Sequence, residues 1–157
     1  MMKKWIIIGT GILLIVLWQA IDIYSTVQAD RQDGLNRYMQ LIPESAVVQE
    51  TFRYHGEKRF MVFNLEIEDS VYAYFYVSED GDTYTLNHDE LVLTSSEAME
   101  KVRQEFSELT VIHRITPAIS GQDFTWEIVA QDSGEDYQYL YYSMTDGEFQ
   151  KRFTLSN

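Results

Sequence analysis

Residues that commonly perform chemistry are present in this chain, but their spacing assembles neither a catalytic site nor a metal site. The three histidines, His55, His88 and His113, show none of the close spacings, such as HExxH, that bring two imidazoles to one metal ion. Serine never occurs as Gly-x-Ser-x-Gly or Ser-x-x-Lys, and no glycine-rich loop is placed to hold a phosphate. The absence of cysteine excludes a disulfide framework, a thiolate zinc site and a cysteine nucleophile. We therefore expect no enzyme activity, no metal site and no cofactor.

Two acidic clusters also have simpler explanations than chemistry. Glu66 and Glu68 share one face of an expected strand whereas Asp69 faces the other way, which favours a solvated edge over an acid–base pair. Residues 79–82 resemble a calcium loop but lack the alternating oxygen ligands and the closing glutamate of an EF-hand. With Gly81 at its centre, this segment is typical of a hairpin turn.

Three tyrosines at alternate positions are the clearest binding signal in the sequence. Tyr72, Tyr74 and Tyr76 recur with a period of two, which places them on one face of a strand. Tyrosine combines an apolar ring with a polar tip and is common at binding surfaces, so we expect these side chains to bind a partner. The alternative is that they fill the contact between the two halves of the protein or form ordinary cross-strand pairs. A similar alternating set follows later in the chain: Tyr137, Tyr139 and Tyr141.

The elements that position these side chains are clearest in the second half of the sequence. Thr94 and Glu97 have the spacing of a capping box, which marks the start of a helix. The apolar residues that follow recur on one helical face: Ala98, Val102, Phe106 and Leu109. Strands are expected at residues 110–115, in a run that ends at Pro117, and then at residues 124–129, 137–144 and 148–155.

The first half repeats this order more loosely. A helix is expected over residues 25–40, with Pro43 stopping it, and strands are expected at 46–54, 59–67 and 71–77. Corresponding glycine and aromatic landmarks recur in the two halves at nearly one constant offset: Gly56 with Gly121, Phe60 with Phe124, and Gly81 with Gly147. The sequence therefore predicts an α+β fold of two tandem α-β-β-β units, residues 25–92 and 93–157, each with an antiparallel sheet and a helix across one face. Neither unit is large enough to bury much alone, so the two should pack together.

The second unit resembles a PepSY-type domain. The resemblance lies in four short motifs: Ser96-Glu97-Ala98, Phe124-x-Trp126-Glu127-Ile128, Tyr139-x-Tyr141, and Asp146-Gly147 before the last strand. The whole chain is similar to the YpmB-like membrane-anchored proteins of Gram-positive bacteria, which carry tandem PepSY/cystatin-like domains. The resemblance implies a cystatin-like fold in the cell envelope and no catalytic role, and PepSY-type domains elsewhere are associated with the restraint of peptidases. The first unit departs from the pattern, with Val62 where the second has Trp126.

Residues 1–24 are predicted to be a membrane anchor. Two lysines precede the apolar run WIIIGTGILLIVLW, which continues with few polar residues to Tyr24. As a helix, Trp5 to Tyr24 would measure about 28 Å, close to a hydrocarbon core of about 30 Å. Lys3 and Lys4 favour an amino terminus inside the cell and a carboxy-terminal domain outside it. A cleaved signal peptide, with its cleavage site after Ala29, is the competing interpretation.

The charge balance limits the partners. The chain has 25 acidic and 12 basic residues, a formal charge of -13, which argues against nucleic acid because a polyanion would be repelled. We expect a membrane-tethered, extracytoplasmic binding or regulatory module that recognises an envelope protein or peptide, for example to modulate an envelope enzyme or peptidase. Open sheet edges that accept an added strand would serve this purpose. The alternative is a receptor or scaffold for a non-protein envelope component, such as a wall polymer or a divalent cation.

Overall fold

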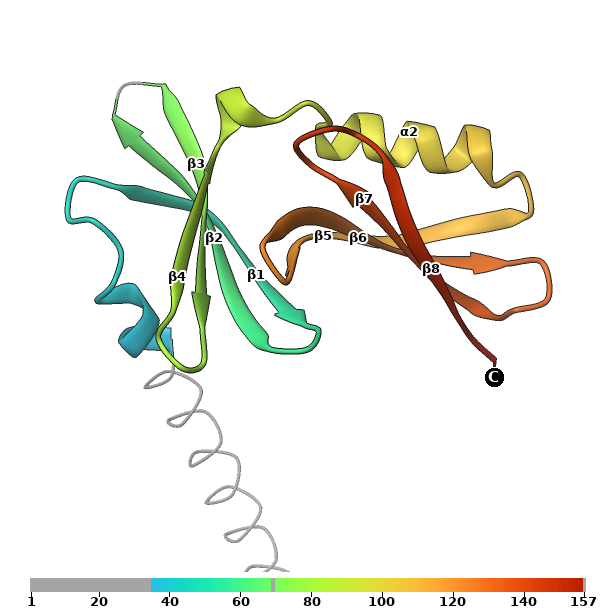
Figure 1. The fold of residues 1–157 in the computed structure, drawn as a ribbon, viewed down its shortest axis with the longest axis horizontal. Coiled ribbons are helices and arrows are strands. Elements are labelled where there is room, and N and C mark those ends of the chain that lie inside the picture. The colour runs from blue at the N-terminus through green and yellow to red at the C-terminus, as the bar shows by residue number, and fades with distance from the viewer. Residues whose placement is uncertain (1–34, 69, 157) are drawn as a thin grey trace, which may run out of the picture. The chain divides into compact units, whose positions relative to one another are not determined.

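The computed structural model describes residues 35–68 and 70–156. Residues 43–156 belong to one compact unit, and residues 35–42 belong to another. The larger unit contains two four-stranded antiparallel sheets and few helices, so the predicted α+β class is confirmed (Figure 1). Each of the two predicted α-β-β-β units contains one of the sheets.

The first sheet is a simple meander with the strand order β1-β2-β3-β4. Its strands are β1 (Val47–His55), β2 (Arg59–Glu68), β3 (Val71–Ser78) and β4 (Thr83–Asn87). The hairpin between β3 and β4 turns at Gly81, whose φ of 92° is a conformation that residues with a Cβ rarely adopt. A short 3-10 helix, η1 (His88–Glu90), follows β4. The three strands predicted for this half are confirmed within one or two residues.

The second sheet repeats the meander with the order β5-β6-β7-β8. Its strands are β5 (Leu109–Ser120), β6 (Asp123–Asp132), β7 (Tyr137–Ser143) and β8 (Phe149–Leu155). One prediction was wrong: the first strand does not end at Pro117, which pairs with Trp126 inside β5. Proline is tolerated there because β5 lies at an edge of this sheet, where half of its backbone groups have no partner strand.

The predicted capping box starts the helix α2 (Ser95–Glu105). The Thr94 hydroxyl accepts a hydrogen bond from the Glu97 amide at 3.3 Å, and the Glu97 carboxylate accepts one from the Thr94 amide at 2.9 Å. The helix packs on β5 and β6 and buries Ala98 and Val102. It ends four residues earlier than the apolar pattern predicted, because Leu109 already belongs to β5.

One core joins the two sheets. Trp126 on β6 is 2% exposed, and its indole N–H donates a hydrogen bond to the Leu93 carbonyl at 2.8 Å. Its ring meets the ring of Tyr74 from the first sheet edge-on, with the centroids 5.6 Å apart. Tyr76 donates a hydrogen bond to the sulfur of Met144 at 3.5 Å, also across the two sheets. The two halves therefore share their buried surface, as expected for units too small to be stable alone.

The opposite face of the first sheet is also apolar and buried, through Met61, Phe63, Leu65, Ala73 and Val77. The helix predicted to cover this face, residues 25–40, lies mostly outside the described residues, and its docking stays a prediction. Residues 35–39 are helical.

The predicted membrane anchor, residues 1–24, also lies outside the described range. Within that range, no helix is long and apolar enough to cross a membrane.

Candidate functional site

The structure changes the interpretation of the predicted tyrosine site. Tyr76 is fully buried and Tyr74 is 7% exposed, because both rings pack against the second sheet, on Phe124 and Trp126 respectively. Burial raises the pKa of Tyr74 to about 12 and raises that of Tyr76 well above its usual range. An external binding role for these two is therefore wrong, and they fill the contact between the halves instead. Tyr72 alone of the three reaches the surface, with 36% of it exposed, and its binding role stays a prediction.

Tyr72 belongs to a pocket at the start of β3. The pocket measures about 420 Å³ and is lined by Ser70, Val71, Tyr72, Asn87, His88 and Asp89. The Tyr72 ring stacks on His88 at 5.8 Å between centroids, and Tyr74 lies beneath the same imidazole at 4.7 Å. Burial lowers the pKa of His88, which disfavours a charged imidazole at this position.

A second tyrosine surface lies on the face of the second sheet that points away from α2. We call it the open face and define it by Arg114, Val129, Tyr137, Tyr139, Phe153 and Leu155, which the strand register places side by side. Phe153 and Leu155 are 55% and 59% exposed, and the two tyrosine side chains are half-buried. Two of the three tyrosines that alternate on β7, Tyr137 and Tyr139, lie here, whereas Tyr141 is buried; the neighbours on β8 complete an exposed aromatic and apolar surface.

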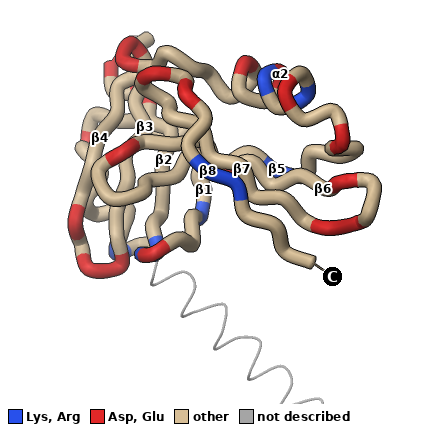
Figure 2. The backbone as a smooth tube through the Cα atoms, turned by 45° about the vertical axis from the view of Figure 1, so that its right-hand side comes forward, with Lys and Arg blue, Asp and Glu red and all other residues tan. Residues whose placement is uncertain are grey.

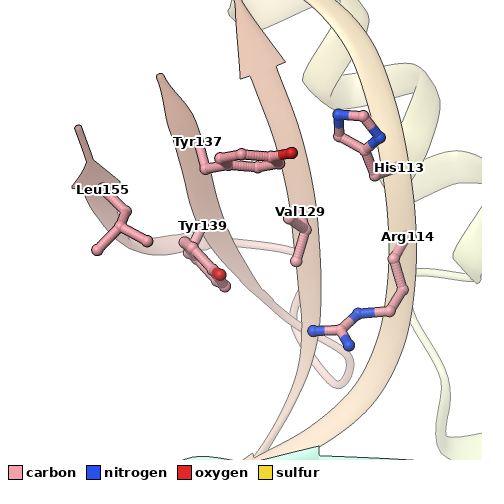
Figure 3. A pocket seen from close by; sticks show the side chains of 6 residues that line it. All are labelled: His113, Arg114, Val129, Tyr137, Tyr139 and Leu155. Carbon is pink, nitrogen blue, oxygen red and sulfur yellow. The ribbon is translucent and has the colours of Figure 1, made fainter. Parts of the chain in front are cut away.

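A pocket of about 380 Å³ opens on this face (Figure 3). Its six lining residues come from all four strands of the sheet: His113, Arg114, Val129, Tyr137, Tyr139 and Leu155. None of them is acidic, although acidic residues outnumber basic ones two to one in the whole chain. The pocket therefore combines aromatic and aliphatic walls with one permanent positive charge.

A β-bulge explains why two consecutive residues line one pocket. Ile112 pairs with Ala130 and Arg114 pairs with Val129, so His113 is an extra residue in β5. In a regular strand His113 and Arg114 would point to opposite faces, but a bulge turns both toward the same side (Figure 3). Strict alternation could not have found this pair, because the bulge leaves no clear mark in the sequence.

Arg114 is held by a buried carboxylate. Glu127 is 5% exposed and accepts a hydrogen bond from the Arg114 guanidinium at 2.9 Å and one from the Tyr141 hydroxyl at 2.6 Å. Burial, and then the hydrogen bond to Glu127, raise the pKa of Tyr141 well above its usual range. Tyr54 from β1 closes this end of the sheet face, and burial followed by the charge of Glu127 raises its pKa as well. The carboxylate thus fixes the direction of Arg114 while 55% of the arginine side chain stays exposed.

His113 lines the other end of the pocket. Its Nε2 lies 3.3 Å from the Gln131 side-chain oxygen, and its ring lies 5.5 Å from that of Tyr137. Both contacts orient the imidazole without enclosing it, so it remains accessible from the pocket (Figure 3).

The strand beside the open face has a free edge. Within residues 43–156, β8 pairs only with β7, so its other edge can accept an added strand. Lys151 lies over the rings of Tyr141 and Phe153, at 4.7 and 5.6 Å from their centroids. Figure 2 shows this basic segment of β8 in a molecule whose turns are largely acidic. Lysine on an edge strand also discourages self-association.

No metal centre is evident in the part of the chain that the structure describes. No group of three or more His, Asp or Glu side chains gathers there in a way that could hold a metal ion.

The fold defines the class of protein: two antiparallel four-stranded sheets in tandem, joined by one core and carrying one helix on the second sheet. A solved structure with this fold is the YpmB protein from Bacillus subtilis, which aligns with a TM-score of 0.63 over 74% of this chain and 91% of that one. The two are 18% identical, so the likeness defines a YpmB-like fold and no activity. No family model and no curated protein matches the sequence.

Proposed function

We propose that the protein is a membrane-tethered, extracytoplasmic binding or regulatory module that recognises an envelope protein or peptide. In this proposal its two sheets are cystatin-like units, the second of PepSY type, and residues 1–24 hold them beside membrane partners. A tether raises the effective concentration of the module near such partners.

The observation that carries the proposal is the open face. Phe153 and Leu155 expose apolar side chains beside the half-buried Tyr137 and Tyr139, and the edge of β8 is free. Contiguous apolar and aromatic patches of this kind on a soluble domain commonly mark an interaction surface. The buried Glu127 positions the guanidinium of the exposed Arg114, and the pair offers no acid–base couple, which favours binding over turnover.

A site-specific photo-crosslinker tests the binding role. Placed at Phe153 in the full chain in intact cells, it should capture a discrete adduct, whereas the same group at Arg103 on α2 should not. Protease sensitivity of the added mass indicates a protein or peptide partner. An added mass that resists protease and yields to a wall hydrolase would favour the wall polymer instead. Identical patterns from the two positions would contradict the open face as a binding surface.

The anchor is tested separately. The full chain should remain in the membrane fraction, with residues beyond about Asp30 digested by protease added outside the cell. Replacing Leu14 by Arg should abolish retention, because a charge at the centre of a spanning helix costs about 3 kcal/mol on insertion scales. A mature form that begins at Asp30 and is released to the medium would establish the cleaved signal peptide.

A further inference from the structure

We propose that the pocket on the open face binds an extended peptide segment that carries one carboxylate and neighbouring apolar side chains, with Arg114 holding the carboxylate. This inference rests on the proposed binding function and adds the chemistry of the partner. It is carried by three features of the pocket: the sign of its charge, the geometry of Arg114 and the nature of its walls.

The sign of the charge is reversed in the pocket relative to the whole chain. The formal charge of the chain is -13, yet the lining holds Arg114, His113 and no acidic residue. The buried Glu127 offsets the charge of Arg114 from behind, but no carboxylate lines the pocket, so a single partner carboxylate meets hydrogen-bond donors there rather than like charge. A long polyanion would be repelled by the rest of the molecule, which disfavours a polymer of many phosphates.

Arg114 has donors available for a second carboxylate. A guanidinium carries five N–H donors, and the Glu127 carboxylate engages the Nη2 group. Because Glu127 is buried while the arginine side chain is 55% exposed, the bonded side is turned into the protein and the remaining donors are turned outward. Arginine binds carboxylates in a planar, two-bond geometry, and a guanidinium already held in place loses little entropy when it does so.

The walls fit apolar side chains next to that carboxylate, because the apolar lining lies on β6, β7 and β8, to one side of Arg114 on β5. Val129 pairs with Tyr139 across β6 and β7, and Tyr137 pairs with Leu155 across β7 and β8 (Figure 3). In an extended peptide, alternate side chains point the same way and lie roughly 6.5–7 Å apart. A Leu-x-Glu-x-Leu pattern thus presents a carboxylate and two apolar groups to one surface.

Binding of three synthetic peptides to the full chain in phosphatidylcholine nanodiscs tests the inference. The probes are fluorescent nonapeptides of alternating Leu and Ser with Glu, Gln or Lys at the central position. By fluorescence polarisation the Glu peptide should bind about tenfold more tightly than the Gln peptide, and the Lys peptide should bind most weakly. The preference should shrink at high salt, because an exposed charge contact is screened.

Paired variants test whether the preference for the Glu peptide depends on Arg114. The double variant R114Q/E127Q removes both charges of the pair without leaving a buried carboxylate alone, and it should bind the Glu and Gln peptides equally. The double variant E100Q/R103Q makes the same change on the exposed ion pair of α2 and should keep the wild-type preference. If R114Q/E127Q fails to fold, Y137S serves instead: it should weaken all three peptides together and keep the Glu preference.

Several outcomes would overturn the inference. They distinguish a failure of the carboxylate specificity from a failure of the proposed binding function. Equal affinity for the Glu and Gln peptides, or an unchanged preference in R114Q/E127Q, removes the carboxylate specificity but leaves a binding module if the crosslinker at Phe153 still captures a protein. Failure of every peptide to bind, together with no adduct at Phe153, rejects both. Competition by poly(glycerol phosphate) but by no peptide would assign the pocket to a wall polymer.

Discussion

Trp126 is a central residue of the contact between the two sheets. It is 2% exposed, donates a hydrogen bond to the Leu93 carbonyl and contacts Tyr74 of the first sheet. Trp126→Ala should therefore cost about 3–5 kcal/mol, as large-to-small changes in a core do. Chemical denaturation of the variant measures this loss. Trp126→Phe should cost less, because it keeps most of the ring and loses mainly the hydrogen bond, and an unchanged midpoint for Trp126→Ala would contradict the packing described here.

His88 adds a pH dependence to stability. Its Nε2 is buried without a hydrogen-bond partner among the described residues, and burial lowers its pKa below 6.5. The folded state therefore disfavours the charged imidazole, so this stability is present above pH 6.5 and is lost as the pH falls through the folded-state pKa. His88→Gln should flatten the fall in stability just below pH 6.5. An NMR titration that places the His88 pKa at or above 6.5 would contradict this.

The sequence predicted which face of a strand a side chain lies on better than it predicted whether that face is exposed to solvent. The period of two correctly placed Tyr74 and Tyr76 on one face of β3, because side-chain alternation is a local property of a strand. Whether that face meets solvent or another sheet depends on contacts between distant segments, such as Tyr76 with Phe124. For that reason the predicted site was largely buried, while the equivalent set on β7 was left half-open.

At the scale of elements, the capping box of α2 provides a direct test. Thr94→Ala removes the hydroxyl that accepts a hydrogen bond from the Glu97 amide. It should cost about 1 kcal/mol, as is typical for an N-cap threonine. Ser96→Ala, within the first helical turn and exposed, is the matched control and should change the free energy of unfolding little. A cost for Ser96→Ala as large as that for Thr94→Ala would contradict a specific capping effect, because alanine is the better helix former.

Element boundaries could be predicted where a local turn sequence sets them. They could not be predicted where they depend on the position of the strand in the sheet. The hairpin at Gly81 was predicted from its local turn sequence, and the glycine there has the positive φ that such a turn needs. The extent of β5 was not, because proline normally ends a strand unless that strand lies at an edge, and edge position is a property of the whole sheet. The bulge at His113 was missed for the same reason, and with it half of the polar lining of the open-face pocket.

At the scale of the whole molecule, one core serves both sheets. Buried residues of the first sheet, such as Tyr76 and Val62, belong to the same apolar cluster as Trp126, Tyr142 and Met144 of the second. The prediction of two similar units describes the strand order well. It understates their dependence on each other, because each uses the other as the second layer that a sheet needs to bury its apolar face.

This shared core predicts that the two sheets unfold together. Tyr76 belongs to the first sheet, but its ring packs on Phe124 and its hydroxyl on Met144 of the second. Tyr76→Ala should therefore cost about 3–5 kcal/mol and should raise amide hydrogen exchange in β2–β3 and β6–β7 together.

Phe153→Ala deletes another aromatic ring, but from an exposed position, and should leave exchange in both regions near wild type. If Tyr76→Ala raised exchange in the first sheet while the second kept full protection, the sheets would be independently stable. The stability of the open face would then not depend on the first sheet. A joint response would mean that a partner bound to the open face stabilises the whole of residues 43–156 against unfolding.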